Sequence, residues 1–240
     1  MPPRLFVDSP LHAGETVALP AGPARHVQVL RLQPGAALTL FDGAGGEWEA
    51  TVTQMGRSEV SVRLVAHTAV DRELPLLATL VIGMPANERM DAVVEKATEL
   101  GVAAIQPLIC ERSVLRLSGE RAQKKVAHWQ AVAVSACEQS GRTRVPQIAE
   151  VTNFAQWLKA APVGPARWML SLRDAQPVAA LTMPAGSVLC LSGPEGGWSP
   201  AEEAAAREVG FAPVSLGPRV LRADTAPLAL LAHLGLRARP

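Results

Sequence analysis

The sequence predicts an α/β protein with two parts, a small β-barrel with one helix over residues 1–72 and a parallel-sheet α/β domain over residues 73–240. Up to Asp71, short strand-like segments are separated by turn signals such as Pro34-Gly35 and Asp42-Gly43, which is typical of a β-rich domain. After Asp71, apolar strands alternate with amphipathic helices. This alternation indicates a parallel sheet with helices on both of its faces.

The order of the elements follows from the same pattern. In the first part, strands are expected at residues 4–7, 16–19, 37–41, 48–54 and 59–64, a helix at 24–31 and a linker at 71–75. The second part begins with a strand at 79–84 and a helix at 88–100, whose end is marked by Gly101. A strand at 103–109, a helix at about 120–140 and strands at 168–172, 188–191 and 213–216 follow, and each of these last three strands is expected to lead into a helix.

The most informative stretch covers residues 191–202, where a strand, a glycine-rich loop and a helix follow one another without a gap. Ser199 and Glu202 form a capping box, and Pro200 occupies the first helical position. Loops at the carboxyl ends of parallel strands are where α/β sheets bind ligands, and the pair Gly196-Gly197 would let the backbone approach a ligand closely. A tight structural turn explains the glycines equally well. Their spacing fits neither a dinucleotide fingerprint nor a phosphate loop.

Composition excludes several classes of protein. A chain of 240 residues, 48% hydrophobic and 19% charged, can bury a sizeable core and is of neither a disordered nor a fibrous type. No apolar run reaches membrane-spanning length, and the first residues do not resemble a signal peptide, so we expect a cytoplasmic protein with no membrane partner. Cys110, Cys137 and Cys190 are as scattered as the histidines, which favours reduced thiols and no metal site.

Basic residues are unevenly distributed, although the formal net charge is only +1. Residues 110–145 carry a basic excess, whereas residues 1–72 are close to neutral. A local excess of this kind favours a polyanionic partner, and a solvated helix surface is the common alternative.

Three loops at the carboxyl ends of strands carry the polar groups that could do chemistry, at residues 171–174, 193–197 and 216–225. In the last of them, Arg219 and Arg222 come just before a helix. Two cations at that place oppose the helix dipole unless an anion compensates them, so a phosphate or a developing anion is a fitting partner. Asp224 is explained either as the cap of this helix or as a functional carboxylate.

A second polar segment follows the long helix predicted at residues 120–140, where Arg142 and Arg144 enter a loop. Cys137 fits a buried thiol better than a nucleophile, because it lies on the apolar side of the helix. Glu99 and Glu138 could act as acids or bases, but salt bridges on a helix surface are the commoner role.

Several motifs occur in one order: Glu95-Lys96-Ala97-Thr98-Glu99-Leu100-Gly101-Val102, Glu111-Arg112-Ser113, Ala136-Cys137-Glu138-Gln139-Ser140-Gly141-Arg142, Gly193-Pro194-Glu195-Gly196-Gly197 and Leu216-Gly217-Pro218-Arg219-Val220-Leu221-Arg222. Together they resemble the bacterial 16S rRNA uridine N3-methyltransferase family of the SPOUT superfamily, over nearly the whole chain. Two positions depart from the family's pattern. Asp224 stands where a glutamate is usual, and Ala86 stands where a basic residue is usual.

The resemblance implies a PUA-like β-barrel that docks on RNA and a SPOUT-type, trefoil-knotted methyltransferase domain, an exception to the rule of unknotted chains. It also implies a homodimer, S-adenosylmethionine as the cofactor, and methylation of uridine N3 in 16S rRNA of the small ribosomal subunit, near the decoding centre. Two rival functions stay open. One is a SPOUT enzyme that methylates another RNA position, such as a ribose 2′-OH, and the other is a non-catalytic RNA-binding protein of ribosome assembly.

The resemblance also assigns roles to individual residues. The catalytic candidates are Arg222, toward the uracil or a phosphate, and Asp224, as a base or as an orienting group. The cofactor is expected to contact Leu170, Ser171, Leu172, Ser192, Gly193, Pro194, Glu195, Gly196, Gly197, Leu216, Gly217, Val220, Leu221 and Arg222. RNA is expected to contact Arg4, His26, Arg31, Arg112, Arg142, Arg144 and Arg219.

Overall fold

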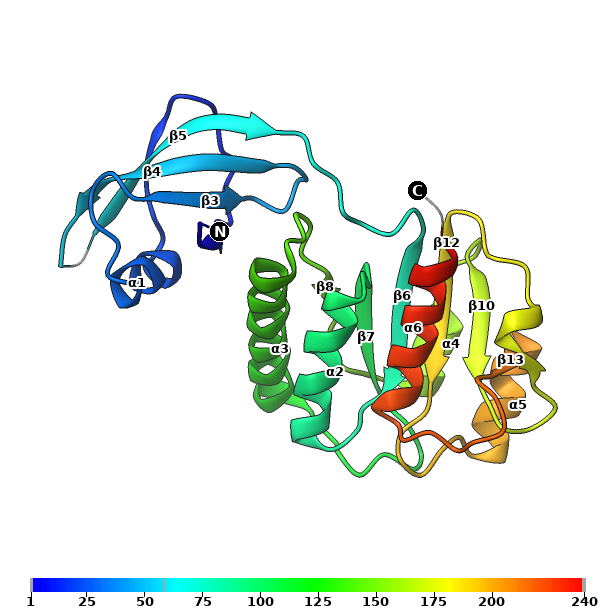
Figure 1. Ribbon diagram of the computed structural model, residues 1–240. Helices are drawn as coiled ribbons and strands as arrows, with labels where there is room; N and C mark the ends of the chain where they lie inside the picture. The colour runs from blue at the N-terminus through cyan, green and yellow to red at the C-terminus, as the bar shows by residue number, and fades with distance from the viewer. Residues whose placement is uncertain (1, 58, 239–240) are drawn as a thin grey trace. The chain divides into compact units, whose positions relative to one another are not determined.

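The computed structural model describes residues 2–57 and 59–238, whose helices and strands are shown in Figure 1. These residues form two compact units. The first unit contains the chain up to Glu73 together with Cys137–Val145, and the second contains Leu74–Ala136 and the chain from Pro146 onward. A segment from the middle of the sequence therefore belongs to the first unit.

The first unit is built on a mixed sheet, which in the described residues has the strand order β1-β3-β4-β5-β2. Its strands are β1 (Arg4–Phe6), β2 (Thr16–Ala18), β3 (Ala37–Phe41), β4 (Glu47–Met55) and β5 (Val60–Thr68), and its helix is α1 (Ala21–Val29). β1 runs parallel to β3, and the other pairs are antiparallel. Alternate side chains of the strands pack with Ala24 and Val27 of α1 in one apolar core.

The second unit is built on a larger sheet in which each pair of neighbouring strands is parallel. In the described residues the strand order is β11-β13-β10-β12-β6-β7-β8, and β9 also pairs with β7. The strands are β6 (Leu77–Gly83), β7 (Ala104–Ile109), β8 (Gln147–Ile148), β9 (Thr152–Asn153), β10 (Ala166–Leu170), β11 (Gln176–Pro177), β12 (Ser187–Ser192) and β13 (Ala212–Ser215).

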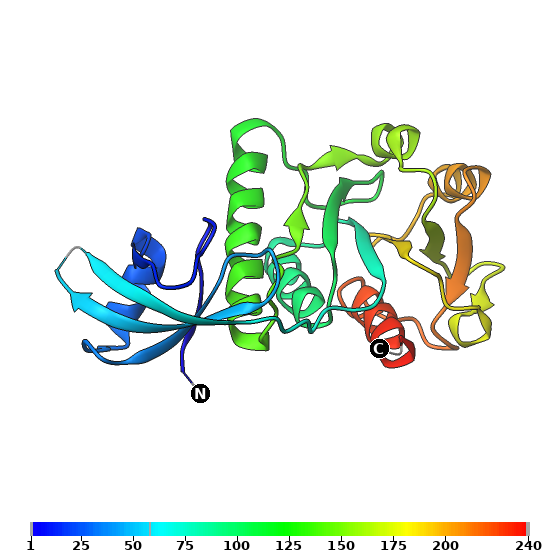
Figure 2. The same ribbon diagram turned by 90° about the horizontal axis from the view of Figure 1, so that it is seen from above.

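Helices cover both faces of this sheet, as the sequence pattern predicts. They are α2 (Asn87–Glu99), α3 (Gly119–Ser140), α4 (Phe154–Ala160), α5 (Pro200–Glu208) and α6 (Thr225–Arg237). Figure 2 shows α2 and α6 on one face and α4 and α5 on the other. Each helix turns an apolar side to the sheet, and in α2 this side contains the fully buried Met90, Val93 and Val94. No helix in the described part of the chain is long and apolar enough to cross a membrane.

The predicted fold class, a β-rich part followed by a parallel-sheet α/β part, is confirmed. One expectation was wrong, because β10 does not lead into a helix. The chain turns at Asp174, which has a φ of +47°, and continues into β11 and the 3₁₀ turn η1 (Val178–Ala180). Helix α4 was not predicted, and it begins after Asn153, whose side chain accepts a hydrogen bond from the Gln156 N–H at 2.8 Å.

Charged hydrogen bonds fasten the segment Cys137–Val145 to the rest of the first unit. The guanidinium of Arg142 forms an ion pair with Glu73, and only 5% of the Arg142 side chain is exposed. Glu138 accepts a hydrogen bond from the Phe6 N–H at 3.0 Å, and Arg72 donates one to the Gly141 carbonyl at 2.9 Å. The end of α3 and the loop after it are thus an integral part of this unit.

Candidate functional site

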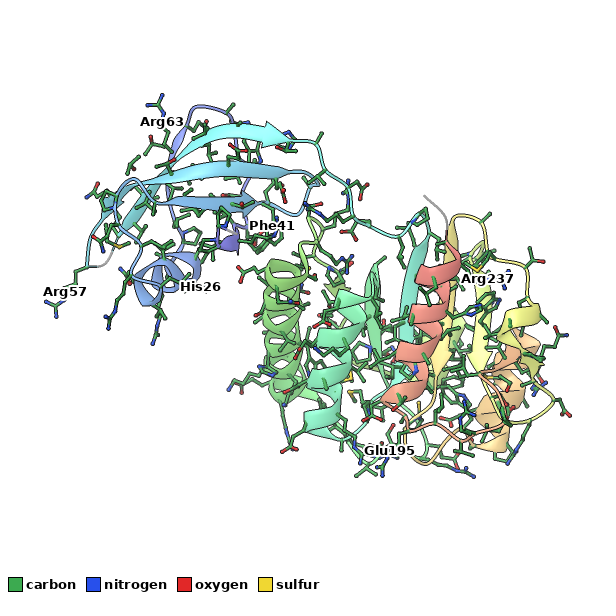
Figure 3. All side chains as sticks on the ribbon, in the orientation of Figure 1. His26, Phe41, Arg57, Arg63, Glu195 and Arg237 are labelled. Atoms are coloured by element: carbon green, nitrogen blue, oxygen red, sulfur yellow. The ribbon has the colours of Figure 1, made fainter. Side chains whose placement is uncertain are left out.

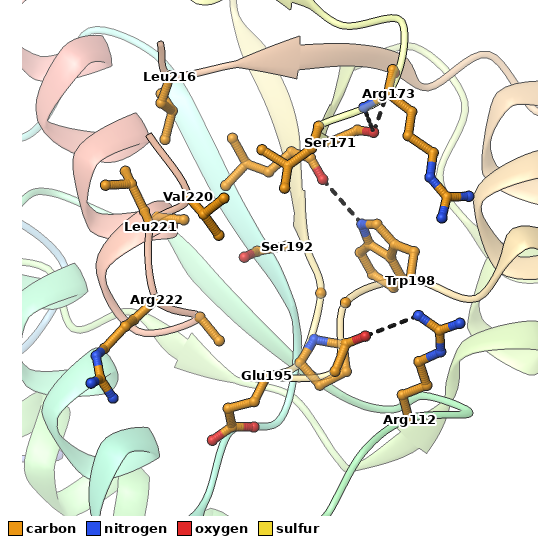
Figure 4. Close-up of a pocket in the computed structure, with 18 of the residues that line it drawn as sticks. Arg112, Ser171, Arg173, Ser192, Glu195, Trp198, Leu216, Val220, Leu221 and Arg222 are labelled. Atoms are coloured by element: carbon orange, nitrogen blue, oxygen red, sulfur yellow. Dashed lines mark hydrogen bonds between the residues drawn. The ribbon is translucent and has the colours of Figure 1, made fainter. Parts of the chain in front are cut away.

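A cavity of about 590 Å³ lies in the second unit, at the carboxyl ends of three neighbouring strands. β13, β10 and β12 are adjacent in the sheet although they are far apart in the sequence, and the loops that follow them surround the cavity. Figure 4 shows this arrangement, with Leu216, Ser171 and Ser192 at the three strand ends. This is the edge at which parallel α/β sheets bind ligands.

All residues that the sequence analysis assigns to a cofactor line this cavity: Leu170, Ser171, Leu172, Ser192, Gly193, Pro194, Glu195, Gly196, Gly197, Leu216, Gly217, Val220, Leu221 and Arg222. The lining also contains five arginines, namely Arg89, Arg112, Arg173, Arg219 and Arg222, together with Trp198 and Glu203. The site therefore combines apolar side chains and glycine backbone with a strongly cationic rim.

The glycine-rich loop after β12 is held by the start of α5. Ser199 and Glu202 form the predicted capping box. The second carboxylate oxygen of Glu202 accepts a hydrogen bond from the Glu111 N–H at 2.7 Å. The indole N–H of Trp198 donates to the Leu170 carbonyl at 3.1 Å, and so joins the loop to β10. These bonds fix the loop before any ligand arrives.

Gly196 has a structural role besides the cofactor contact expected of it. A Cβ at this position would lie 2.8 Å from the Cβ of Arg112 and 3.2 Å from the Arg112 carbonyl oxygen. Arg112 also donates a hydrogen bond to the Gly196 carbonyl at 3.1 Å. Gly196 is thus required by the close approach of the Arg112 segment, and no ligand needs to be invoked for it. The left-handed backbone is at Gly197, with a φ of +67° and open space beside it.

Glu195 connects the loop to the start of α2. Its carboxylate accepts a hydrogen bond from the Ala86 N–H at 2.9 Å and lies 3.6 Å from the guanidinium of Arg89. The resemblance leads one to expect a basic side chain at position 86, where this chain has alanine. The Glu195 carboxylate is instead contacted by the Ala86 backbone N–H and by Arg89.

Glu203 is a buried carboxylate in the cavity wall that the sequence analysis missed. It is 7% exposed and accepts hydrogen bonds from the Ser171 hydroxyl at 2.6 Å and from Arg207 at 3.0 Å. Burial alone would raise the pKa of Glu203, but these hydrogen bonds outweigh it and hold the pKa below its ordinary value of 4.5. The i, i+4 spacing of Glu203 and Arg207 signalled an ion pair, but nothing in the sequence signalled Ser171 as a partner.

Arg222 and Asp224 both lie at the start of α6, as expected, but in different settings. Arg222 is exposed and lines the cavity. Asp224 stands at the N-cap position in a helical conformation, and its side chain makes no capping hydrogen bond. Its carboxylate lies 3.5 Å from the Thr225 hydroxyl. The explanation of Asp224 as a helix cap is therefore wrong.

The residues predicted to contact RNA are divided between the two units. Arg112 and Arg219 line the cavity. In the first unit, His26, Arg31 and Arg144 are exposed. Arg4 forms an ion pair with Glu47, and its side chain is 14% exposed. Arg142 is buried against Glu73, which argues against the phosphate contact expected of it.

The thiols are not available as nucleophiles. Cys110, Cys137 and Cys190 are buried, and burial raises the pKa of each thiol to about 12. The interpretation of Cys137 as a buried thiol is thus confirmed. Glu99 forms an ion pair with Lys96 at 2.8 Å, the surface role considered for it. No group of His, Cys, Asp or Glu side chains that could hold a metal ion occurs among the residues described.

Two family models match the chain. The model of an RNA methyltransferase domain matches residues 72–235, and the model of an RNA methyltransferase PUA domain matches residues 24–65. The chain is 36% identical over 226 residues to the ribosomal RNA small subunit methyltransferase E of Synechocystis, which covers 91% of this chain and 72% of the relative. It is 31% identical to the protein of the same name from Bacillus subtilis, over 87% of this chain and 84% of the relative.

A solved structure matches the whole fold. The ribosomal RNA small subunit methyltransferase E of Neisseria gonorrhoeae, in a crystal structure with S-adenosylmethionine, superposes with a TM-score of 0.93 at 38% identity, over 98% of both chains. The fold, the cavity and the two family models thus define an RNA methyltransferase with an N-terminal PUA-like domain. More narrowly, the identities to curated relatives show that the chain belongs to the ribosomal RNA small subunit methyltransferase E family.

Proposed function

We propose that the protein transfers a methyl group from S-adenosylmethionine to N3 of a uridine in 16S rRNA of the small ribosomal subunit, near the decoding centre. The observation that carries this proposal is the cavity at the ends of β10, β12 and β13, in a chain that belongs to this methyltransferase family. The target atom and its location on the subunit come from the resemblance of the sequence motifs.

The residues of the cavity fit the cofactor. A volume of about 590 Å³ is in the range of sites for small organic molecules. Leu170, Leu216 and Val220 supply apolar contact, and the glycine-rich loop supplies backbone groups. The carboxylates of Glu195 and Glu203 also lie in the lining, where they face Arg89 and Arg173. When bound, S-adenosylmethionine supplies an electrophilic methyl group on a positively charged sulfur.

The chemical difficulty lies in the uridine. Neutral uridine N3 carries a proton and is a poor nucleophile, so a site must take up that proton and stabilise the charge that develops on the flanking carbonyl oxygens. Arg222 lines the cavity with a planar guanidinium that can donate hydrogen bonds to such an oxygen. Asp224, two residues further along, is the proposed base or orienting group. The alternative acceptor of the N3 proton is water.

The cationic rim suits the RNA. Of the five arginines in the lining, Arg89 and Arg173 face glutamates, at 3.6 and 3.9 Å. Arg112, Arg219 and Arg222 are exposed at the mouth of the cavity and fit the phosphates around a target nucleotide. We propose in addition that residues 73–240 form a trefoil-knotted domain, that residues 1–72 form the RNA-docking domain, and that the chain acts as a homodimer in the cytoplasm.

The test uses small ribosomal subunits from cells that lack this methyl group, incubated with the protein and methyl-labelled S-adenosylmethionine. The modified base is then mapped. Label on N3 of one uridine supports the proposal, whereas label on a ribose 2′-oxygen assigns the protein to another RNA methylation. Absence of label, together with no heat of S-adenosylmethionine binding in calorimetry, points to a non-catalytic assembly protein.

A further inference from the structure

A second hollow, of about 330 Å³, lies entirely within the first unit, between the end of α1 and the turn that joins β4 to β5. We refer to it as the α1–hairpin hollow. Its lining consists of Gln28, Arg31, Leu32, Gln33, Met55, Gly56 and Arg57. The resemblance leads one to expect RNA at Arg31, and the proposed function makes residues 1–72 an RNA-docking domain. Neither assigns this hollow or Arg57, and neither says which part of the RNA would lie there.

The walls of the α1–hairpin hollow are joined by hydrogen bonds. The side-chain amide of Gln28 donates to the carbonyl of Gly56 at 3.1 Å and to that of Arg57 at 3.2 Å, so α1 holds the turn. Leu32 and Met55 pack against the apolar core of the barrel and give the hollow an apolar floor. The shape of the hollow is therefore fixed by the fold.

Arg31 occupies a backbone conformation that does not suit it. Its φ is +54°, and it is the second residue after α1, next to the C-cap residue Leu30. Its N–H donates to the Gln28 carbonyl at 3.0 Å, and the Leu32 N–H donates to the Val27 carbonyl at 3.2 Å. This left-handed position at the end of a helix is normally taken by glycine, because a Cβ is unfavourable there. An arginine at this place therefore indicates a use for its side chain.

The charge of the hollow is also uncompensated. Arg31 and Arg57 are both exposed, and neither forms an ion pair with a residue in the described part of the chain. In a domain that is nearly neutral as a whole, they place two planar cations beside an apolar floor. Phosphates pair with such cations, and unstacked bases pack on guanidinium planes and apolar side chains.

We infer that the α1–hairpin hollow binds one unpaired nucleotide of the RNA substrate, with the base over Leu32 and Met55 and the adjoining phosphates on Arg31 and Arg57. This inference rests on the proposed function, since it assumes an RNA substrate, and it adds a second contact remote in sequence from the methyl-transfer site. The hollow then holds the RNA in place and takes no part in the chemistry.

The test compares single variants of the full-length protein. Arg31→Gly removes the side chain and relieves the backbone, so we expect an equal or higher Tm. We also expect affinity for unmodified small subunits to fall on the order of tenfold, the effect of one charge-assisted contact, and the slope of log affinity against log salt to decrease by about 0.7. Arg57→Gln should weaken binding in the same way. Affinity for S-adenosylmethionine should not change in either variant.

Arg63→Gln is the matched control. Arg63 is an exposed arginine of β5, and Figure 3 shows it on the side of the barrel away from α1, whereas Arg57 projects from the end near α1. This variant should bind subunits like the wild type. Cross-linking of 4-thiouridine-labelled 16S rRNA should mark peptides within residues 28–33 or 54–57.

The inference is overturned if Arg31→Gly and Arg57→Gln bind subunits like the wild type, or if cross-links in the first unit fall only outside these peptides. Loss of affinity for intact subunits with normal affinity for protein-free 16S rRNA overturns it too, because the partner would then be an acidic ribosomal protein. All of these readouts measure binding. If the wild type transfers no methyl group, the proposed function is contradicted. The binding measurements still test the hollow, because they do not depend on methyl transfer.

Discussion

Arg222 is the residue on which the proposed chemistry depends most. Its side chain lines the cavity and is exposed, so it can reach a base that enters from solution. We expect Arg222→Ala to lower turnover by a factor of about 10² to 10³, which is typical when a preorganised donor to a developing anion is removed. Calorimetry should show nearly unchanged affinity for S-adenosylmethionine, because the cofactor contacts expected of the 216–222 loop are made by its backbone, which the alanine variant keeps. A variant with wild-type turnover would exclude Arg222 from the reaction.

Asp224 can be tested cleanly because its side chain caps nothing. We expect Asp224→Asn to leave the Tm within about 2 °C of the wild type, as for a surface substitution, while turnover falls steeply because asparagine accepts no proton. Wild-type turnover would instead assign the N3 proton to water, with Arg222 stabilising the uracil anion.

Predictability from sequence differs between individual residues. The cofactor-site residues could be placed because they follow strands directly, and the sheet brings strand ends together. The burial of Arg142 and Glu203 could not be foreseen, because each depends on a partner distant in sequence. Glu73 lies 69 residues from Arg142, and Ser171 lies 32 residues from Glu203. Exposure of a charged side chain is decided by such tertiary contacts.

At the scale of elements, Glu203 joins α5 to the loop after β10. Because its pKa is lowered in the folded protein, it adds stability above its unfolded pKa near 4.5, and this stability is lost as the pH falls through the folded pKa. At pH 7, Glu203→Gln should therefore lower the free energy of unfolding by about 1.5 kcal/mol. The difference from wild type should shrink below about pH 4.5. Urea titrations of both proteins at pH 7 and below about pH 4.5 measure this difference in the free energy of unfolding.

Glu208→Gln, an exposed change on the same helix, is the control and should have no comparable pH-dependent effect. A Glu203→Gln variant as stable as the wild type at pH 7 would show that the hydrogen bonds from Ser171 and Arg207 contribute nothing to the folded state.

The loop after α3 contains two arginines, Arg142 and Arg144, which differ in burial although they are close in sequence. Arg142→Gln leaves the half-buried Glu73 without this partner, so we expect the free energy of unfolding to fall by about 3 kcal/mol, the lower end for a buried ion pair. Arg144 is exposed, and Arg144→Gln should change stability by less than about 0.5 kcal/mol. Chemical denaturation of the two variants compares them directly. Equal stabilities would contradict the placement of Arg142.

Elements with strong local signals could be predicted closely. The capping box of Ser199 and Glu202 located the start of α5, and Gly101, with a φ of +88°, located the end of α2. The two-residue strands β8, β9 and β11 carry no periodicity and were not predicted. Helix α1 begins at Ala21, earlier than predicted, because Pro23 is tolerated in a first helical turn.

At the scale of the whole molecule, cofactor binding should stabilise the fold. A ligand that binds only the native state at 100 times its Kd adds about 2.7 kcal/mol to the free energy of unfolding. We therefore expect S-adenosylmethionine to raise the Tm in a concentration-dependent way in differential scanning calorimetry. Choline, a cation that lacks both the adenosine and the methionine parts, serves as the control and should leave the Tm unchanged. A Tm that does not respond to S-adenosylmethionine would argue against the cavity as its site.

The segment Cys137–Val145, which completes the first unit, has a consequence for biosynthesis. Residues 1–73 leave the ribosome before Glu138 and Arg142 have been synthesised. The hydrogen bond from Phe6 to Glu138 and the ion pair of Glu73 with Arg142 therefore form only later. The β-rich unit reaches its final form only after α3 has emerged. A chain whose synthesis stalls within residues 74–136 would thus leave this unit unfinished, because Cys137–Val145 would be missing.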